Sequence, residues 1–398
     1  MSTPLPLDPQ ITSRIIPTKA LNFHILEAGY TPSHDRPLIL LLHGFPELAF
    51  SWRKVIPHLA EAGYYVVAPD QRGFGRTTGW DTRPFHEVDL TTFSLTSFVR
   101  DMVILVHALG YRSVRCVVGH DLGAVTAAMC ALVRPDLFQS LVLLSHPFNG
   151  SPSLPFDTAT PETSNSTSRN AEAGGGAESA AGDHVHEELA ALGRKHYKWY
   201  YSTPPANDDM THPPGGLHDF LRGYFHLKSG SWSGNTPHQL QGWTASELVK
   251  LPYYYVMPLD ATMPQAVSKH MEQEPETEVQ TCRTWLTDDD LAVYVAEYER
   301  TGFQGGLNWY RVRTAANSQY TNDFDVYAGR KIDVPCAFVS GKLDWGIYQE
   351  PEALKKMQDG RVCSDFRSLK LVDGVGHWAP QESPGPVVAT ILELATGL

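Results

Sequence analysis

Hydrophobic positions in the first part of the chain alternate between short β-branched runs and longer amphipathic runs. The short runs predict buried strands at residues 21–27, 38–42, 65–68, 114–118 and 141–145. The longer runs carry apolar residues at helical spacing and predict helices at residues 52–62, 93–109 and 124–133. Strands that alternate with helices are typical of a mostly parallel sheet with helices on both faces, so we expect an α/β fold.

The middle of the chain follows a different pattern. Residues 151–183 are rich in small, polar and acidic residues with almost no large apolar side chains, which predicts a flexible low-complexity loop. Residues 184–325 are rich in aromatic residues and prolines, show no strand rhythm, and predict a helical cap (or lid) domain. Within this region the acidic run 288–290 predicts the start of a helix, which Gly302 ends.

The strand rhythm returns near the C-terminus. Residues 335–340 and 368–372 predict strands, and residues 386–395 predict a closing helix. We therefore expect one α/β core made of residues 1–150 and 326–398, interrupted by the loop 151–183 and the cap 184–325.

One short segment between a predicted strand and a predicted helix is the most informative part of the chain. It reads Gly119-His120-Asp121-Leu122-Gly123, which is the spacing of a G-x-S-x-G nucleophile elbow with aspartate at the reacting position. Glycines flank this turn because it is tight and because the following helix packs close to the strand. The structural alternative is that Asp121 only caps the helix that follows.

A carboxylate at this position favours a different reaction from that of a serine. It is ionised at neutral pH, with an ordinary pKa of roughly 4, and it can attack without a base. Attack on a carbonyl carbon would give a labile anhydride, whereas attack on a saturated carbon gives an ordinary ester that water can cleave. Asp121 therefore indicates displacement at a saturated carbon, and epoxides and carbon–halogen compounds are the two substrate classes that fit.

The segment His43-Gly44-Phe45-Pro46-Glu47 follows a predicted strand and can supply part of an oxyanion hole. Such a hole needs backbone N–H donors that converge on one oxygen atom. We assign these donors to Phe45 and to Leu122, the residue after the nucleophile.

His377 and Asp344 lie where an elbow nucleophile needs its partners. His377 is in a loop after one predicted strand, and Asp344 is at the end of another. The order Asp121, Asp344, His377 is that of α/β-hydrolases, so we expect His377 to activate water and Asp344 to orient the imidazole. Asp373 is a second candidate partner, and an ordinary core or surface histidine is the structural alternative for His377.

Composition narrows the function classes further. The chain has 398 residues and a formal net charge of −12, which disfavours binding to nucleic acid or to an anionic membrane. The five cysteines are scattered, which predicts reduced core residues, and no Cys/His spacing resembles a zinc site. No signal-peptide pattern and no membrane-spanning run is present, so we expect a cytoplasmic protein, either a monomer or a homodimer.

Four motifs together resemble one known family. The segments 43–47, 119–123, 342–345 and 376–378 look like those of the α/β-hydrolase-fold epoxide hydrolases of the soluble type. The resemblance covers roughly residues 14–150 and 184–398. It implies the α/β-hydrolase fold with an eight-stranded sheet, an inserted helical cap, and a cis peptide bond before Pro46.

Two cap segments are similar to those that carry the ring-opening tyrosines of this family. Residues 301–311 follow the pattern throughout and map one tyrosine to Tyr310. Residues 196–201 map the other to Tyr197, although Tyr200 and Tyr201 lie nearby. The phenol O–H groups would hold the epoxide oxygen and supply a proton, and simple packing of the rings is the structural alternative.

The resemblance favours an epoxide hydrolase that needs no cofactor or metal and converts a small lipophilic epoxide and water to a vicinal diol. Substrate contacts are expected from Pro46, Trp309 and Trp378. One alternative is a haloalkane or haloacid dehalogenase with the same nucleophile, but Leu122 stands where dehalogenases carry a halide-binding tryptophan. The other is a non-catalytic ligand-binding protein of the same fold, which the intact set of candidate catalytic residues disfavours.

Overall fold

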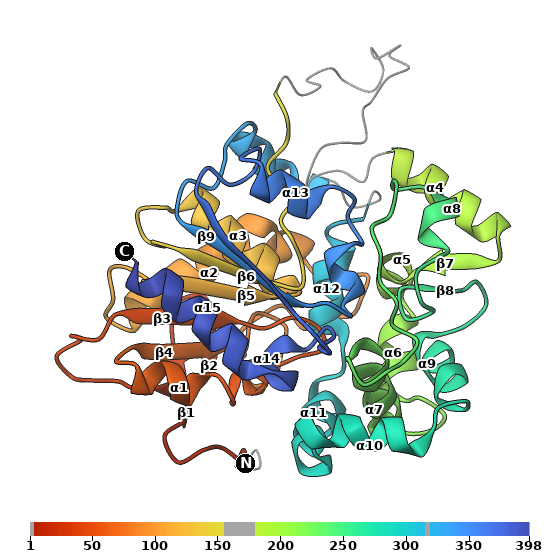
Figure 1. Ribbon diagram of the computed structural model, residues 1–398, viewed down its shortest axis with the longest axis horizontal. Coiled ribbons are helices and arrows are strands. Elements are labelled where there is room, and N and C mark those ends of the chain that lie inside the picture. Colours follow the sequence, from red (N-terminus) through yellow and green to blue (C-terminus); the bar gives the residue numbers. More distant parts are fainter. Residues whose placement is uncertain (1–3, 155–179, 315–318, 398) are drawn as a thin grey trace.

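The computed structural model describes residues 4–154, 180–314 and 319–397, which form a sheet core and a cap (Figure 1). The core sheet has eight strands in the order β1-β2-β4-β3-β5-β6-β9-β10. Only β2 runs antiparallel to its neighbours, so the predicted mostly parallel eight-stranded sheet is confirmed. The strands are β1 (Thr12–Pro17), β2 (Asn22–Ala28), β3 (Leu38–Leu42), β4 (Tyr65–Pro69), β5 (Cys116–His120), β6 (Leu141–Leu144), β9 (Cys336–Gly341) and β10 (Phe366–Val372).

Two apolar cores lie on opposite faces of the sheet because successive residues of a strand point to opposite sides. In β3, Leu40 belongs to one core and Leu41 to the other. Helices α2 (Leu95–Ala108) and α3 (Leu122–Val133) cover the first face, and α1 (Ile56–Glu61) and α15 (Pro384–Thr396) cover the second. Both faces are covered, so the central parallel strands β3 and β5 are buried along their whole length. Two short helices complete the core, α13 (Ala353–Gln358) and α14 (Ala379–Glu382).

The cap is inserted between β6 and β9 and lies at one end of the sheet, in green to cyan in Figure 1. Its helices are α4 (Ala180–Ala191), α5 (Tyr197–Tyr201), α6 (Ala206–Thr211), α7 (Leu217–Lys228), α8 (Ala245–Leu248), α9 (Met263–Met271), α10 (Glu276–Trp285), α11 (Asp288–Thr301) and α12 (Gln304–Arg311). The cap also contains a two-stranded antiparallel sheet, which the pattern did not predict, made of β7 (Arg194–His196) and β8 (Val256–Pro258).

The ends of two cap helices can be compared with the sequence pattern. Helix α11 begins with a capping box between Thr287 and Asp290 and ends at Gly302, which has a positive φ of 63°, as the acidic run and the glycine predicted. Helix α4 begins at Ala180, inside the segment that was predicted to be a loop. Residues 155–179 of that segment lie outside the described residues.

All five cysteines are buried and none forms a disulfide, as predicted. No helix among the described residues is long and apolar enough to cross a membrane. The peptide bond between Phe45 and Pro46 is cis, as the resemblance implied.

Candidate active site

Asp121 stands at the turn between β5 and α3, in a strained backbone conformation. Its φ of 53° lies in the left-handed region, which residues other than glycine seldom adopt. A Cβ at Gly119 would overlap the backbone of Gly123, and a Cβ at Gly123 would overlap the carbonyl group of Leu42. Both glycines are therefore required by the close approach of strand and helix. The side chain of Asp121 accepts no capping hydrogen bond from α3, so helix capping does not explain its presence.

The two carboxylate oxygens of Asp121 have different neighbours. The N–H of Phe45 donates to Oδ1 at 3.0 Å, and Nε2 of His377 forms an ion pair with Oδ2 at 3.5 Å. Burial alone would raise the pKa of Asp121, but the His377 and Lys228 charges hold it well below the usual range. Leu122 is the first residue of α3, so its N–H has no carbonyl partner within the helix. The carboxylate is therefore ionised, and of the two expected N–H donors that of Phe45 contacts it directly.

His377 is held on its other side by Asp344. Nδ1 of His377 lies 3.0 Å from Oδ1 of Asp344. The hydroxyl of Ser340 donates to Oδ2 of Asp344 at 3.0 Å, and the N–H of Gly346 donates to Oδ1 at 2.7 Å. Asp373 is exposed and pairs with Lys342 at 2.6 Å, so Asp344 is the carboxylate that contacts the histidine.

The charges around His377 set its protonation state. Burial lowers the pKa of His377, but the carboxylates of Asp344 and Asp121 outweigh burial and raise this pKa to about 9, while Lys228 acts in the opposite direction. The histidine is therefore protonated at neutral pH as long as Asp121 carries its charge.

Tyr197 in α5 and Tyr310 in α12 lie side by side, with ring centroids 5.8 Å apart. Tyr310 also contacts the ring of Phe45, which is next to the candidate nucleophile. Neither phenol O–H has a hydrogen-bond partner among the described residues. Burial, and after it the negative charge of Asp121, raises the pKa of both tyrosines well above the ordinary value. Both hydroxyls are thus neutral donors within the field of Asp121.

Tyr200 and Tyr201, the neighbours that made Tyr197 ambiguous in the sequence, have partners elsewhere. The hydroxyl of Tyr200 donates to Asp209 at 2.9 Å, and that of Tyr201 donates to Tyr224 at 3.1 Å. Within this segment, Tyr197 is therefore the tyrosine whose hydroxyl remains available.

The three residues predicted to contact substrate have different surroundings. Pro46 is buried and follows Phe45 through the cis peptide bond. Trp378 packs against His377, with centroids 4.5 Å apart, and its indole N–H donates to the carbonyl of Phe225 at 2.8 Å. Trp309 stacks on Phe98 at 3.7 Å, and its indole N–H donates to the carbonyl of Arg72 at 2.9 Å. These contacts attach Trp309 to the cap–core packing rather than to Asp121.

A second buried pair, His120 and Glu47, lies behind His377, and no sequence pattern indicated a role for it. Nδ1 of His120 lies 2.5 Å from Oε2 of Glu47, and its Nε2 donates to the carbonyl of His377 at 2.8 Å. Both residues belong to motifs that the sequence displays, Glu47 at the end of His-Gly-Phe-Pro-Glu and His120 just before Asp121. Their contact with the histidine loop depends on the tertiary fold, so the motifs alone could not assign it.

Lys228, at the end of α7, is a further buried charge that no sequence pattern indicated. It is 3% exposed and has no hydrogen-bond acceptor for its ammonium group among the described residues. The ammonium instead lies 4.7–5.9 Å from the centroids of four aromatic rings, Tyr224, Tyr254, Tyr255 and Trp378.

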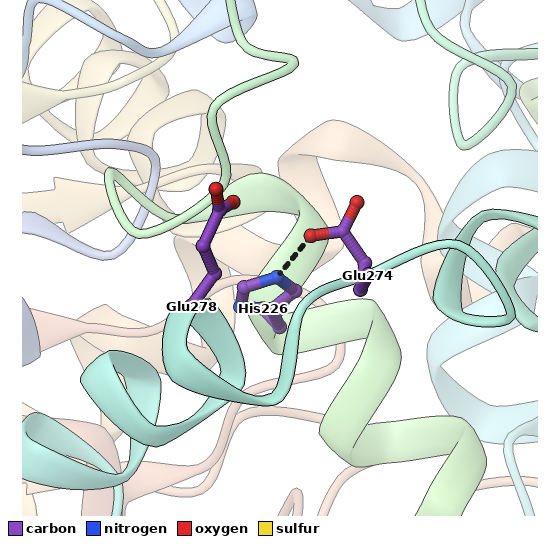
Figure 2. A group of neighbouring side chains, drawn as sticks. All are labelled: His226, Glu274 and Glu278. Atoms are coloured by element: carbon purple, nitrogen blue, oxygen red, sulfur yellow. Dashed lines mark hydrogen bonds and ion pairs between the residues drawn. The ribbon is translucent and has the colours of Figure 1, made fainter.

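Among the described residues, one group in the cap has the residue types of a metal site: His226, Glu274 and Glu278 (Figure 2). Nε2 of His226 lies 3.2 Å from Glu274, which also accepts the indole N–H of Trp232 at 2.7 Å. Glu278 accepts the backbone N–H of Ser233 at 3.2 Å. Each carboxylate already has protein donors, so the group is explained by hydrogen bonds that fix the segment after α7.

Comparison with known proteins identifies the family of this chain. Residues 37–243 match the family described as the alpha/beta hydrolase fold. Epoxide hydrolase A of Mycobacterium tuberculosis is 30% identical over 97% of this chain and 98% of that protein. Two solved structures are similar: an epoxide hydrolase from an endophytic Streptomyces (TM-score 0.72, 27% identity, 98% and 96% of the two chains) and a mutant of potato epoxide hydrolase (TM-score 0.68, 26% identity, 98% and 100%). The chain belongs to the α/β-hydrolase-fold epoxide hydrolases.

Proposed function

We propose that this enzyme converts epoxides to vicinal diols through an alkyl ester on Asp121. The observation that carries the proposal is the position of an ionised carboxylate between the N–H of Phe45 and His377, within the field of two unpartnered phenols. A carboxylate nucleophile and hydroxyl donors on the leaving oxygen are the two groups that opening an epoxide requires.

In the first step Oδ2 of Asp121 attacks a ring carbon, because Oδ1 is held by the Phe45 N–H. The carbon–oxygen bond of the ring breaks, and its electron pair moves to the epoxide oxygen. Tyr197 and Tyr310 hold that oxygen, and one of them gives it a proton. Their raised pKa values support this role, since a phenol must be neutral to donate.

In the second step water cleaves the ester. Alkylation removes the negative charge of Asp121, which is one of the two charges that raise the pKa of His377. The imidazolium then gives its proton to the tyrosinate left by the first step, and the neutral imidazole can take a proton from water, with Asp344 behind it stabilising the imidazolium that forms.

The oxygen of that water adds to the ester carbonyl, and the resulting oxyanion on Oδ1 meets the N–H groups of Phe45 and Leu122. Collapse breaks the ester bond, and the imidazolium protonates the departing alkoxide. The carboxylic acid left on Asp121 gives its proton to His377, which restores the resting carboxylate–imidazolium pair.

The aromatic surroundings favour a lipophilic or aryl epoxide. Phe45, Tyr201 and Trp378 contact the candidate nucleophile's neighbours, and the Tyr201 hydroxyl and the Trp378 indole N–H already donate to Tyr224 and Phe225. A dehalogenase is disfavoured because Leu122 has no indole, and the indole N–H groups of Trp309 and Trp378 already donate to backbone carbonyls. The cytoplasmic location and the choice between monomer and homodimer stay predictions from the sequence.

A single turnover with excess enzyme in oxygen-labelled water tests the covalent route. We expect the label in the Asp121 carboxylate and an unlabelled diol, because the oxygen added to the ring comes from the enzyme. Label in the first diol with none in Asp121 contradicts the route. Asp121→Asn should abolish turnover, while the matched control Asp373→Asn, at an exposed aspartate near the histidine, should keep it.

The alternatives predict other products. A dehalogenase would release halide from chlorinated or brominated alkanes and give no diol from an aryl epoxide. A non-catalytic binding protein would hold an aryl epoxide without turnover. One assay of the purified protein on both substrate panels separates the three possibilities.

A further inference from the structure

Glu382, at the end of α14, binds the backbone on both sides of His377. Its Oε2 accepts the N–H of Gly376 at 3.0 Å, and its Oε1 accepts the N–H of Trp378 at 2.9 Å. Oε2 also accepts the N–H of Gly230, a cap residue, at 2.8 Å. One carboxylate therefore joins the loop that carries the candidate base to the cap.

The remaining amide of this loop is also bound by the cap. The N–H of His377 donates to the carbonyl of Lys228 at 2.8 Å. Glu382 thus accepts the N–H groups of residues 376 and 378, and the cap accepts the N–H group of residue 377 between them. None of these three N–H groups takes part in the hydrogen bonding of a helix or strand. The position of the imidazole is consequently set by these contacts rather than by regular secondary structure.

The cap segment 228–230 lies directly against the loop. A Cβ at Gly376 would overlap the backbone of residues 228–230, and a Cβ at Gly230 would overlap the carbonyl of Gly374. Because the two backbones touch, a shift of either segment moves the other.

We propose that Glu382 is a positioning residue that fixes the histidine loop to the cap segment 228–230, so that His377 stands where it can activate water against the Asp121 ester. This inference rests on the proposed function, since it assumes that His377 is the base of the second step. Ester formation does not need the base, because Asp121 attacks unaided. Glu382 should therefore matter for ester hydrolysis and not for ester formation.

Only the ionised form of Glu382 can accept hydrogen bonds from all three N–H groups. A carboxylate has enough lone pairs for three N–H donors, whereas an amide has one oxygen and presents N–H groups of its own. Burial raises the pKa of Glu382 to about 7, and the three backbone N–H groups act against that rise. Glu382→Gln keeps the shape but sets an NH₂ group against a backbone N–H, so it should release one end of the junction.

The experiment follows one turnover of an aryl epoxide in the full-length protein. Intact-protein mass spectrometry measures how fast the ester forms and how fast it decays. For Glu382→Gln we expect formation at the wild-type rate and decay slower by roughly tenfold to a hundredfold, within the range that a positioned general base contributes. The ester should accumulate, and kcat and KM should fall together. Glu393→Gln, an exposed glutamate in α15, is the control and should behave as wild type.

Each other outcome is decisive. Equal slowing of both steps would mean that Glu382 only supports the fold, and unchanged decay would mean that it does not position the base; either result overturns the inference. If Glu382→Gln does not fold, Glu382→Asp carries the test, because it keeps the charge with a shorter reach and should slow decay alone. Failure to detect an ester in the wild-type enzyme would instead refute the proposed function.

Discussion

Replacement of Asp344 by asparagine separates the two proposed steps most sharply. Asp344 is buried, its Oδ1 lies 3.0 Å from Nδ1 of His377, and its charge is the largest influence that raises the pKa of this histidine. An asparagine has nearly the same shape and can keep the hydrogen bonds from Ser340 or Gly346. The substitution therefore removes the charge with little change in packing.

The size of the effect follows from the pKa of His377. A rise from 6.5 to about 9 corresponds to roughly 3 kcal/mol of preference for the imidazolium form, at 1.36 kcal/mol for each pKa unit. This figure is a net value: Asp121 adds to it in the resting enzyme, whereas burial and Lys228 subtract from it. In ester hydrolysis the imidazole becomes imidazolium, so loss of Asp344 should slow this step by about a hundredfold.

The assay measures ester formation and decay in single turnovers over a range of pH. We expect unchanged formation and slower decay in Asp344→Asn. Asp344 raises the pKa of His377, so its removal lowers that pKa and shifts the acid limb of the decay rate to lower pH. Glu382→Gln should leave this limb in place, which distinguishes a lost charge from a lost position. Slower ester formation, or an acid limb that moves to higher pH, would refute the reasoning.

Three further predictions test other parts of the structure. Tyr310→Phe and Tyr197→Phe should each slow ester formation by about a hundredfold, as expected for removal of a preorganised donor, and leave ester decay unchanged. Tyr200→Phe is the control and should leave ester formation at the wild-type rate, because the hydroxyl of Tyr200 binds Asp209. Lys228→Met should move the acid limb of ester decay to higher pH, opposite to Asp344→Asn, because Lys228 lowers the pKa of His377. Asp70→Asn should lower the free energy of unfolding by about 2 kcal/mol at pH 7. Burial acts to raise the pKa of Asp70, but His24 and His43 hold it at about 2 in the folded protein. The pKa of this carboxyl in the unfolded chain is 3.8, and the difference gives the expected loss. This depressed pKa stabilises the fold above pH 4, so the difference between wild type and variant, measured by denaturant unfolding, should shrink as the pH falls from 4 to 2.

The sequence pattern predicted the central elements because local and tertiary requirements agree there. The apolar run of β3 is buried on both faces, and helix α11 has its own capping box and a C-terminal glycine. Strand β1 escaped prediction because it is an edge strand whose residues are mostly exposed, so it has little alternation to read. Strands β7 and β8 are three residues long, which is too short for any periodicity.

In the candidate site, too, some residues could be identified from the sequence and others only from the structure. Chain order and motif spacing identified Asp121, Asp344 and His377, because strand ends of a parallel sheet bring these residues to one edge. The family resemblance mapped the second tyrosine to Tyr197, and the structure adds a reason that no residue pattern contains, since Asp209 accepts the hydroxyl of Tyr200. The contacts of Glu382 are backbone N–H groups from two domains, and backbone groups leave no trace in a residue pattern. The catalytic roles of all these residues stay predictions that the experiments above test.

The environment of Lys228 explains why no sequence pattern indicated its charge and why this charge influences the pKa of His377. A carboxylate partner would cancel most of the field of a buried ammonium group at the distance of His377. Four aromatic rings at 4.7–5.9 Å instead stabilise the cation through their quadrupoles, and no acceptor in the described part of the chain is hydrogen-bonded to it. In the proposed mechanism Asp121 becomes a neutral ester, and Asp344 then raises the pKa of His377 while burial and Lys228 lower it. This opposition can bring the histidine to the neutral form that a base requires while Asp344 still stabilises the proton it receives, so both charges serve the same step.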